Sequence, residues 1–357
     1  MELFAGRYRL VDPVGEGGMG SVWRAWDVKR RRYAAAKLLR SAEAGDVLRF
    51  VREQALRVEH PHVVAPIGWA AEDDKVLLAM DLVAGGSVHH LLGDYGPLPA
   101  PYAAVLVDQL LDALTAVHAH GIVHRDVKPS NLLLELTGRA APRLRLSDFG
   151  IAVVAGEPRL TENSSVIGTR GYLPPEAMTG VDVAPGHDVY SAGVVAWQLL
   201  TGAAPPRNGP RPDADAPPEH VPEPLWREAA AWVAADPRAR PTSAADARQR
   251  WSAARKAADL PPIDPADPDA VEVFDQLAPL PEGFGPEGPL PPASAAVFPR
   301  QPPAPHSEAP TVRLAPTPPQ PATLKNRRTS VGLIAALSTA AVGLLIMAGS
   351  LFLLLRP

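Results

Sequence analysis

Two short polar segments in the first half of the chain constrain its fold more than any other feature. Residues 124–131 read His-Arg-Asp-Val-Lys-Pro-Ser-Asn, and Asp-Phe-Gly follows at residues 148–150. Between them they supply a carboxylate, an amine and two side chains able to bind a divalent metal, namely Asp126, Lys128, Asn131 and Asp148. This order is the one needed for phosphoryl transfer from ATP, in which the protein mainly positions and neutralises phosphates. Two unrelated polar turns would not reproduce the same order and spacing.

A glycine-rich segment near the N-terminus fits the pattern Gly-x-Gly-x-x-Gly-x-Val. Its residues are Val14, Gly15, Glu16, Gly17, Gly18, Met19, Gly20, Ser21 and Val22. Glycines let the backbone approach phosphate oxygens, where a Cβ would clash. A dinucleotide-binding loop shares this spacing. Here, however, the segment joins two strand-like runs with no helix after it, which argues against a dinucleotide-binding fold. Lys37 follows in an apolar run and is a candidate phosphate ligand.

On these motifs the chain resembles the eukaryotic-like (Hanks-type) Ser/Thr protein kinases of bacteria, from about Tyr8 to about Trp251. It is most similar to the membrane-anchored actinobacterial type, and its Ala-, Arg- and Pro-rich composition fits a high-GC genome. The resemblance implies an α+β, two-lobed protein-kinase fold, with a small antiparallel β-sheet lobe carrying one helix and a larger helical lobe. It also implies ATP and Mg²⁺ as cofactors, with Mn²⁺ as an alternative metal.

The resemblance assigns an ATP site in the first 133 residues. Lys37 would grip the α- and β-phosphates and pair with Glu53, which stands closer to His60-Pro61 than the family pattern leads us to expect. Met80 would be the gatekeeper. The backbone of two residues would contact adenine, and three side chains would close on its faces; these five are Asp81, Val83, Val22, Ala35 and Leu133.

The resemblance also assigns the catalytic roles. Asp126 would orient the substrate hydroxyl and accept its proton, while Lys128 would neutralise the γ-phosphate. Asn131 and Asp148 would hold Mg²⁺. A Lys two places after the catalytic Asp is typical of Ser/Thr-directed rather than Tyr-directed kinases.

The segment from Gly150 to Glu176 corresponds to the activation segment. Thr161, Ser164 and Ser165 are candidate phosphoacceptors there, and Arg125 is the cation that would pair with a phosphate.

Further roles follow from the resemblance around this segment. Thr169 would belong to the substrate-facing loop, Glu176 would pair with Arg240, and Asp188 would anchor the catalytic-loop backbone. Between residues 202 and 219, Pro, Arg and Asp replace the helix expected there, which makes substrate choice harder to infer.

Apolar periodicity predicts strands at residues 8–14, 21–26, 33–39, 63–69 and 76–80, and helices at 46–58, 101–120, 188–200 and 243–257. We therefore expect a kinase domain over residues 8–255. Residues 256–324 are rich in Pro and are expected to form a disordered linker. The apolar island 270–280 could dock somewhere, but a linker with scattered apolar residues is the preferred interpretation.

Residues 331–355 are apolar or small and carry no charge. They would span roughly 37 Å as a helix, enough to cross a bilayer. Lys325, Arg327 and Arg328 precede them, so the positive-inside rule keeps the preceding domain in the cytoplasm. We expect a single-pass, C-terminally anchored protein of the cell membrane, in contact with lipid. With no Cys and a net charge of −4, neither a thiol nucleophile nor nucleic-acid binding is expected.

The predicted function is an active Ser/Thr protein kinase, a transferase of bacterial signalling that autophosphorylates its activation loop. A membrane-tethered pseudokinase scaffold remains as the alternative. A small-molecule phosphotransferase is disfavoured by the Gly168-Thr169 loop, the Pro175-Glu176 pair and Arg240. Protein substrates are expected, together with a phosphothreonine-binding, forkhead-associated partner at Thr311 and a homodimer through the sheet lobe.

Overall fold

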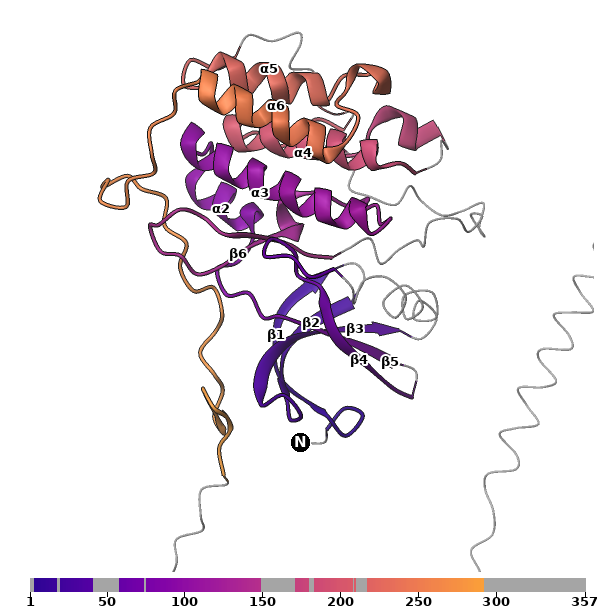
Figure 1. Cartoon of the computed structure of the whole chain (residues 1–357). Coiled ribbons are helices and arrows are strands. Elements are labelled where there is room, and N and C mark those ends of the chain that lie inside the picture. Colours follow the sequence, from indigo (N-terminus) through magenta and orange to yellow (C-terminus); the bar gives the residue numbers. More distant parts are fainter. Residues whose placement is uncertain are drawn as a thin grey trace, which may run out of the picture. The chain divides into compact units, whose positions relative to one another are not determined.

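The computed structural model of the chain describes residues 3–17, 20–40, 58–73, 75–148, 171–179, 183–207, 209 and 217–291. These residues form a sheet lobe, built from the first part of the chain, and a helical lobe that begins after residue 87 (Figure 1). Residues 81–86, called the hinge below, connect the two lobes.

The sheet lobe contains one antiparallel sheet in the order β1-β2-β3-β5-β4. Its strands are β1 (Tyr8–Gly17), β2 (Gly20–Asp27), β3 (Arg32–Arg40), β4 (Pro66–Glu72) and β5 (Lys75–Met80). Successive side chains of a strand point to opposite faces. Tyr8, Ala36 and Leu77 pack together on one face, whereas Ala35 and Leu78 on the other face join the core that continues into the helical lobe.

The helical lobe packs around the apolar helix at residues 185–201, most of which are buried. Its α-helices are α2 (Val88–Tyr95), α3 (Ala100–Ala119), α4 (Pro185–Thr201), α5 (Glu223–Trp232) and α6 (Ala244–Ala257). Three short 3₁₀ helices accompany them in the described residues: η2 (Pro129–Asn131), η3 (Pro175–Thr179) and η4 (Pro237–Ala239). Strands β6 (Leu132–Leu134) and β7 (Leu144–Leu146) form a small antiparallel pair. A Cβ on Gly193 of α4 would lie 2.8 Å from Trp232 Cβ, so glycine allows α4 and α5 to approach closely. Trp251 of α6 donates its Nε1 proton to the carbonyl of Ala104 at 3.0 Å and ties α6 to α3.

The predicted strands and helices of the described residues are confirmed, with one shift. The fourth strand begins at Pro66 rather than at Val63. Residues 62–64 hydrogen-bond instead to Leu146 of β7, through His62 O and Val64 N, and so belong to the boundary with the helical lobe. No helix forms in the described part of residues 202–219, as expected from its composition. The predicted helix 46–58 lies outside the described residues except for Val58.

Among the described residues, α3 is the one helix long and apolar enough to cross a membrane by length and composition. Half of its residues are buried against neighbouring elements, as in a core helix. The predicted span at residues 331–355 lies outside the described part of the chain.

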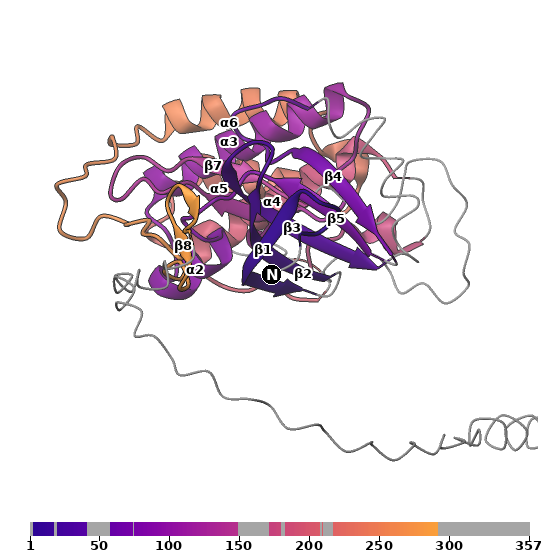
Figure 2. The same ribbon diagram turned by 90° about the horizontal axis from the view of Figure 1, so that it is seen from below.

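The prediction of a disordered linker is wrong for residues 259–291, which we call the strap. The strap leaves α6, runs along both lobes and ends in a two-residue hairpin of β8 (Phe284–Gly285) and β9 (Gly288–Pro289) beside the sheet lobe (Figures 1 and 2). Val271 and Val273 are 4% and 1% exposed and belong to the main core. The apolar island therefore docks, and the packed unit extends well past the predicted boundary at residue 255.

Candidate phosphotransfer site

The catalytic-loop residues converge on the carboxylate of Asp126. Lys128 Nζ lies 2.8 Å from Asp126 Oδ2. Asn131 Nδ2 donates to the same oxygen at 2.9 Å and to the backbone carbonyl of Asp126 at 2.7 Å. Because the amide nitrogen of Asn131 faces Asp126, its oxygen remains the group available as a metal ligand. The loop from α3 to β6 thus brings together Asp126, Lys128 and Asn131, the three catalytic residues predicted from its motif.

A buried carboxylate on α4 holds this loop in place. Asp188 is 0% exposed and accepts hydrogen bonds from the backbone amides of His124 (2.7 Å) and Arg125 (2.8 Å) and from His118 Nε2 (2.8 Å). Burial by itself would raise the pKa of Asp188, but these donors and the histidine charges lower it overall. Asp188 therefore anchors the catalytic loop as an ionised group, in the position predicted from the sequence.

The two polar segments are joined through His124 and Ser147. His124 Nε2 donates to the Ser147 carbonyl at 2.9 Å, and Ser147 donates from N and Oγ to the Asn131 carbonyl at 2.9 and 3.0 Å. Arg125 and Asp148 have positive φ values of 69° and 57°, a backbone conformation that residues other than glycine seldom adopt. Such strain gathers at functional sites, where the surrounding contacts enforce it.

The side chain of Lys37 reaches Asp148 from the sheet lobe. It lies on β3 opposite Val22 of β2, is 6% exposed, and its Nζ is 2.7 Å from Asp148 Oδ1. A buried Lys is costly unless a counter-charge lies close by. In the described residues that counter-charge is Asp148. Glu53, the predicted partner, lies outside them.

The predicted adenine-contacting residues line the boundary between the lobes. Met80, the last residue of β5, pairs with Ala35 of β3. The other three apolar candidates, Val22, Val83 and Leu133, are only partly buried and pack against the main core. Asp81 follows Met80, and its carboxylate is held by Arg32 (3.1 Å) and Arg145 (3.2 Å).

The glycine-rich segment forms the β1–β2 hairpin. Across it, Gly15 pairs with Val22, Glu16 with Ser21 and Gly17 with Gly20, and Val14 precedes them on β1. A Cβ on Gly15 would meet no atom within 4 Å, so the protein's own packing does not require glycine there. The open space beside the backbone fits a bound phosphate group. Gly18 and Met19 lie outside the described residues.

The oxygen donors also fit a divalent metal. Within the described part of the chain, no group of three or more His, Cys, Asp or Glu side chains forms a ready metal site. Mg²⁺ is commonly held by one or two protein oxygens together with substrate phosphates. Asp148 and Asn131 supply a donor set of that kind.

Glu176 and Arg240 form a largely buried ion pair in the helical lobe. Arg240 Nη1 and Nη2 lie 2.5 and 3.0 Å from the two carboxylate oxygens of Glu176. Burial opposes ionisation of Glu176, but the hydrogen bond from Arg240 lowers its pKa overall. The pair ties η3, at the end of the predicted activation segment, to the loop before α6.

Several supporting residues were not predicted from the sequence. Arg145 and Ser147 lie between the two polar motifs and His118 precedes them, and no residue pattern marks any of the three. His124 begins the catalytic-loop motif, which is the one signal that could have drawn attention to it. The candidate sites Thr161, Ser164, Ser165, Thr169 and Thr311 lie outside the described residues.

A sheet lobe and a helical lobe that meet at a Lys–Asp pair and an Asp–Lys–Asn loop form the arrangement expected of a protein kinase domain. The family model for the protein kinase domain matches residues 8–217. The chain belongs to the protein kinase family, and within it to the bacterial Hanks-type group.

Curated relatives support this placement. The chain is 37% identical over 247 residues to the serine/threonine-protein kinase PkaA of Streptomyces coelicolor, covering 62% of this chain and 45% of PkaA. It is 37% identical over 207 residues to PknD of Mycobacterium tuberculosis (57% of this chain, 31% of PknD) and 34% identical over 206 residues to PrkC of Bacillus subtilis (56% and 31%). The chain thus spans less than half the length of these relatives. The family as a whole uses ATP and a divalent metal.

Proposed function

We propose that this chain is a Ser/Thr protein kinase that transfers the γ-phosphoryl group of ATP to protein hydroxyls. The observation that carries the proposal is the convergence of Lys128 and Asn131 on Asp126, beside the Lys37–Asp148 pair. Every charged position that the chemistry requires in the described residues is filled, which speaks against a pseudokinase scaffold. The names of the relatives, all serine/threonine-protein kinases, point to the same acceptor class.

Each residue has a distinct role in the proposed reaction. Asp126 accepts a hydrogen bond from the substrate hydroxyl, orients it and takes its proton as the oxygen attacks. Lys128 carries the positive charge that offsets the charge developing on the transferred group. Lys37 binds the remaining phosphates. Asn131 and Asp148 would hold the divalent metal, for which we propose Mg²⁺, with Mn²⁺ as a substitute; the metal would neutralise the phosphates.

Arg125 supports a proposal for activation. Its Nε has no hydrogen-bond partner among the described residues although its side chain is half-buried, and burial lowers its pKa. A phosphate on Thr161, Ser164 or Ser165 would supply a hydrogen-bonding counter-charge and order the loop around Asp126. Autophosphorylation between copies would provide that phosphate.

Location and partners are proposed from the sequence. A helix over residues 331–355 would anchor the chain in the cell membrane, in contact with lipid, with the kinase on the cytoplasmic side. Phosphorylated Thr311 would recruit a forkhead-associated domain, and two sheet lobes would form the homodimer. Phosphopeptide mapping that never finds phosphate between residues 300 and 323 would remove the Thr311 proposal.

The decisive experiment incubates the detergent-solubilised full-length chain with labelled ATP and Mg²⁺, with and without a generic basic protein. An Asp126→Asn variant serves as the control, and mass spectrometry locates the phosphate. We expect phosphoserine or phosphothreonine in the activation segment and on the added protein, absent from the control. ATP binding without any transfer would replace the kinase by a nucleotide-binding scaffold.

A further inference from the structure

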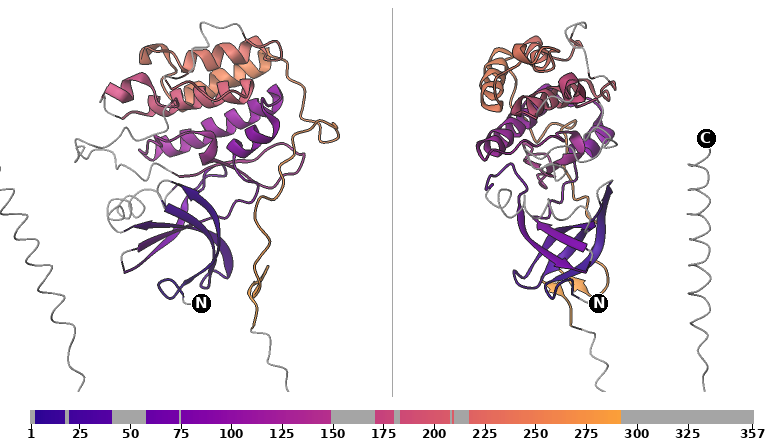
Figure 3. Two further views of the ribbon diagram at one scale, coloured as in Figure 1. Left: turned by 180° about the vertical axis from the view of Figure 1, so that it is seen from behind. Right: turned by 90° about the vertical axis from the view of Figure 1, so that its right-hand side faces the viewer.

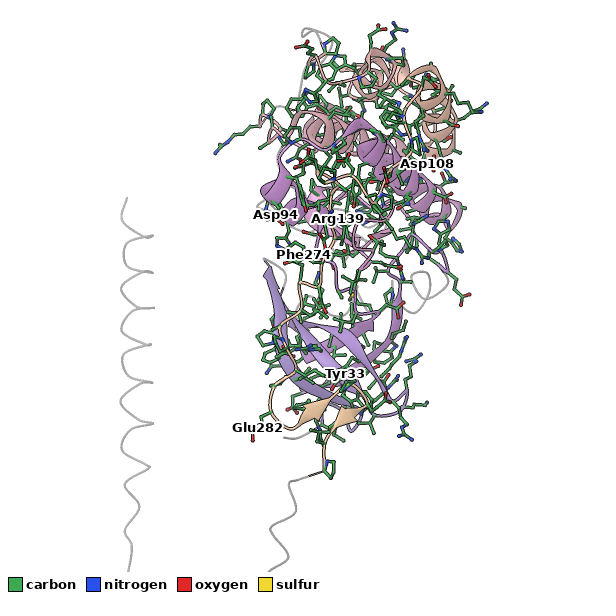
Figure 4. All side chains as sticks on the ribbon, turned by 90° about the vertical axis from the view of Figure 1, so that its left-hand side faces the viewer. Tyr33, Asp94, Asp108, Arg139, Phe274 and Glu282 are labelled. Atoms are coloured by element: carbon green, nitrogen blue, oxygen red, sulfur yellow. The ribbon has the colours of Figure 1, made fainter. Side chains whose placement is uncertain are left out.

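The strap is a second connection between the two lobes. The family match ends at residue 217, so the strap lies beyond the segment that defines the family. Leu260 and Ile263 pack on the helical lobe, and the chain then passes the hinge and reaches the sheet lobe (Figure 3). Figure 4 shows Phe274 at the level where the lobes meet and Glu282 beside the sheet. Three separate groups of contacts hold this path.

The first group lies on the helical lobe. Val273 and Gly138 exchange backbone hydrogen bonds of 2.8 and 3.0 Å, in the manner of an antiparallel bridge. The Tyr95 hydroxyl at the end of α2 accepts from the Glu272 amide at 3.1 Å, and the Glu272 carboxylate lies 3.2 Å from Arg139 Nε. The strap is therefore fixed to the loop after β6 and to α2.

The second group lies on the hinge itself. The amide of Gln276 donates to the Ala84 carbonyl at 2.8 Å. A Cβ on Gly85 would lie 2.5 Å from Val273 Cγ1, and one on Gly86 would lie 2.8 Å from Gln276 Cγ. Two consecutive glycines thus let the strap press directly on the backbone that follows Asp81 and Val83.

The third group lies on the outer part of the sheet lobe. Arg24 Nη2, on β2, donates to the Ala278 carbonyl at 3.0 Å, and the Tyr33 hydroxyl on β3 donates to the Gly285 carbonyl at 2.7 Å. Gly288 has a φ of +110°, and a Cβ there would lie 2.5 Å from Trp26 Cζ2. Because Trp26 is itself buried, a side chain at residue 288 would push the hairpin away from the sheet.

We propose that the strap positions the hinge and the sheet lobe for ATP, by holding the lobes in the orientation that binds the nucleotide. The proposal rests on the proposed function for its ligand. ATP must touch the hinge, Lys37 and the helical-lobe residues at once, so it binds only the fraction of molecules whose lobes are correctly oriented. Apparent affinity falls in proportion to that fraction. A strap anchored on both lobes and on the hinge between them raises the fraction of molecules whose lobes are correctly oriented. A chain that ended at α6 would lose all three groups of contacts.

A matched pair of glycine substitutions tests this role in the full-length protein. Gly288→Ala introduces a Cβ that collides with Trp26, whereas a Cβ on Gly283, which has a φ of +86°, meets nothing within 4 Å. Both variants carry the cost of a positive φ, so they differ in the contact with the sheet lobe. We expect the Kd for ATP·Mg²⁺, measured by titration calorimetry well below the melting temperature, to rise about 3- to 10-fold for Gly288→Ala. Gly283→Ala should stay close to wild type.

Tyr33→Phe gives a milder second test, because it removes one hydroxyl and keeps the ring packing. It should raise the Kd by a smaller factor in the same direction. If either Gly288→Ala or Tyr33→Phe lowers the melting temperature while the Kd remains that of the wild type, the strap is structural only and the proposal is wrong.

Hydrogen exchange separates this inference from the proposed function. The amides of Val273 and Gln276 donate to Gly138 and Ala84, so they should exchange slowly in the wild-type chain without nucleotide. If these amides exchanged at the rate of an unfolded peptide, the strap would not be docked and the inference would be wrong, whether or not the chain binds ATP. If the wild-type chain bound no ATP, the proposed function would fail while the protected amides still reported a docked strap.

Discussion

The catalytic loop lies within the helical lobe and the strap runs along both lobes. Both are irregular segments, yet they are held by different chemistry. The catalytic loop depends on a charged side chain, the fully buried Asp188, which accepts from two backbone amides and from His118. The strap depends on backbone groups, on buried valines and on glycines that permit close approach. The first kind of anchor concentrates its energy in one residue, and the second distributes it over many.

The largest expected effect concerns catalysis. Asp148→Asn removes the negative charge that faces Lys37 and would bind the metal. We expect the rate of phosphate transfer to fall by about 10²- to 10³-fold. Labelled-ATP assays beside Asp94→Asn, an exposed carboxylate on α2, measure the loss. A rate within a few-fold of wild type would remove Asp148 from the proposed site.

The second prediction concerns the anchor of the catalytic loop. Asp188→Ala leaves two buried backbone amides and His118 without their acceptor. Removing one partner of a buried charged network costs about 3–5 kcal/mol. Urea unfolding should show a loss of this size in the free energy of unfolding, against about 0.5 kcal/mol or less for Asp94→Ala at the surface. Equal losses in the free energy of unfolding for Asp188→Ala and Asp94→Ala would show that Asp188 does not anchor the catalytic loop.

This contrast also explains what the sequence could predict. Asp126, Asn131 and Asp188 act through specific functional groups, so their identities and spacing are visible as motifs. The strap acts through main-chain hydrogen bonds that any residue can make, and its Pro-rich composition resembles that of a disordered linker. Val271 and Val273 alternate in the manner of a half-buried strand, but the partner strand is absent: Gly138 offers only a single bridge. Ser147 was not predicted either, because two of its three hydrogen bonds described above are made by its backbone.

The third prediction tests the distributed anchor. Val273 is 1% exposed, whereas the next residue, Phe274, is 49% exposed. Val273→Ala removes two buried methyl groups and leaves a small cavity beside Gly85, at a cost of about 2 kcal/mol. Phe274→Ala, although it deletes more atoms, should change the free energy of unfolding by about 0.5 kcal/mol or less. A larger loss for Phe274→Ala would mean that the strap packs with its other face inward.

The smallest effect is a difference in how the two anchors respond to acid. The pKa of Asp188 in the folded protein lies below its ordinary value of 3.8, because the donors from His118, His124 and Arg125 outweigh its burial. Its contribution to stability is therefore complete above that ordinary value and is lost as the pH falls through the lowered pKa. The Val273 side chain and the Gly138 backbone that it bridges contain no titrating group, and the neighbouring Glu272–Arg139 ion pair is exposed.

Urea unfolding of wild type, Asp188→Ala and Val273→Ala from pH 6 to the lowest pH at which the wild type remains folded separates the two anchors. The penalty of Asp188→Ala should shrink at the acid end, because the wild-type carboxyl is then protonated and has lost its charge-dependent advantage. The penalty of Val273→Ala should stay constant over the same range. A Val273→Ala penalty that fell in parallel would show that the strap is held through titrating groups after all, and the distinction between a charged anchor and a backbone anchor would disappear.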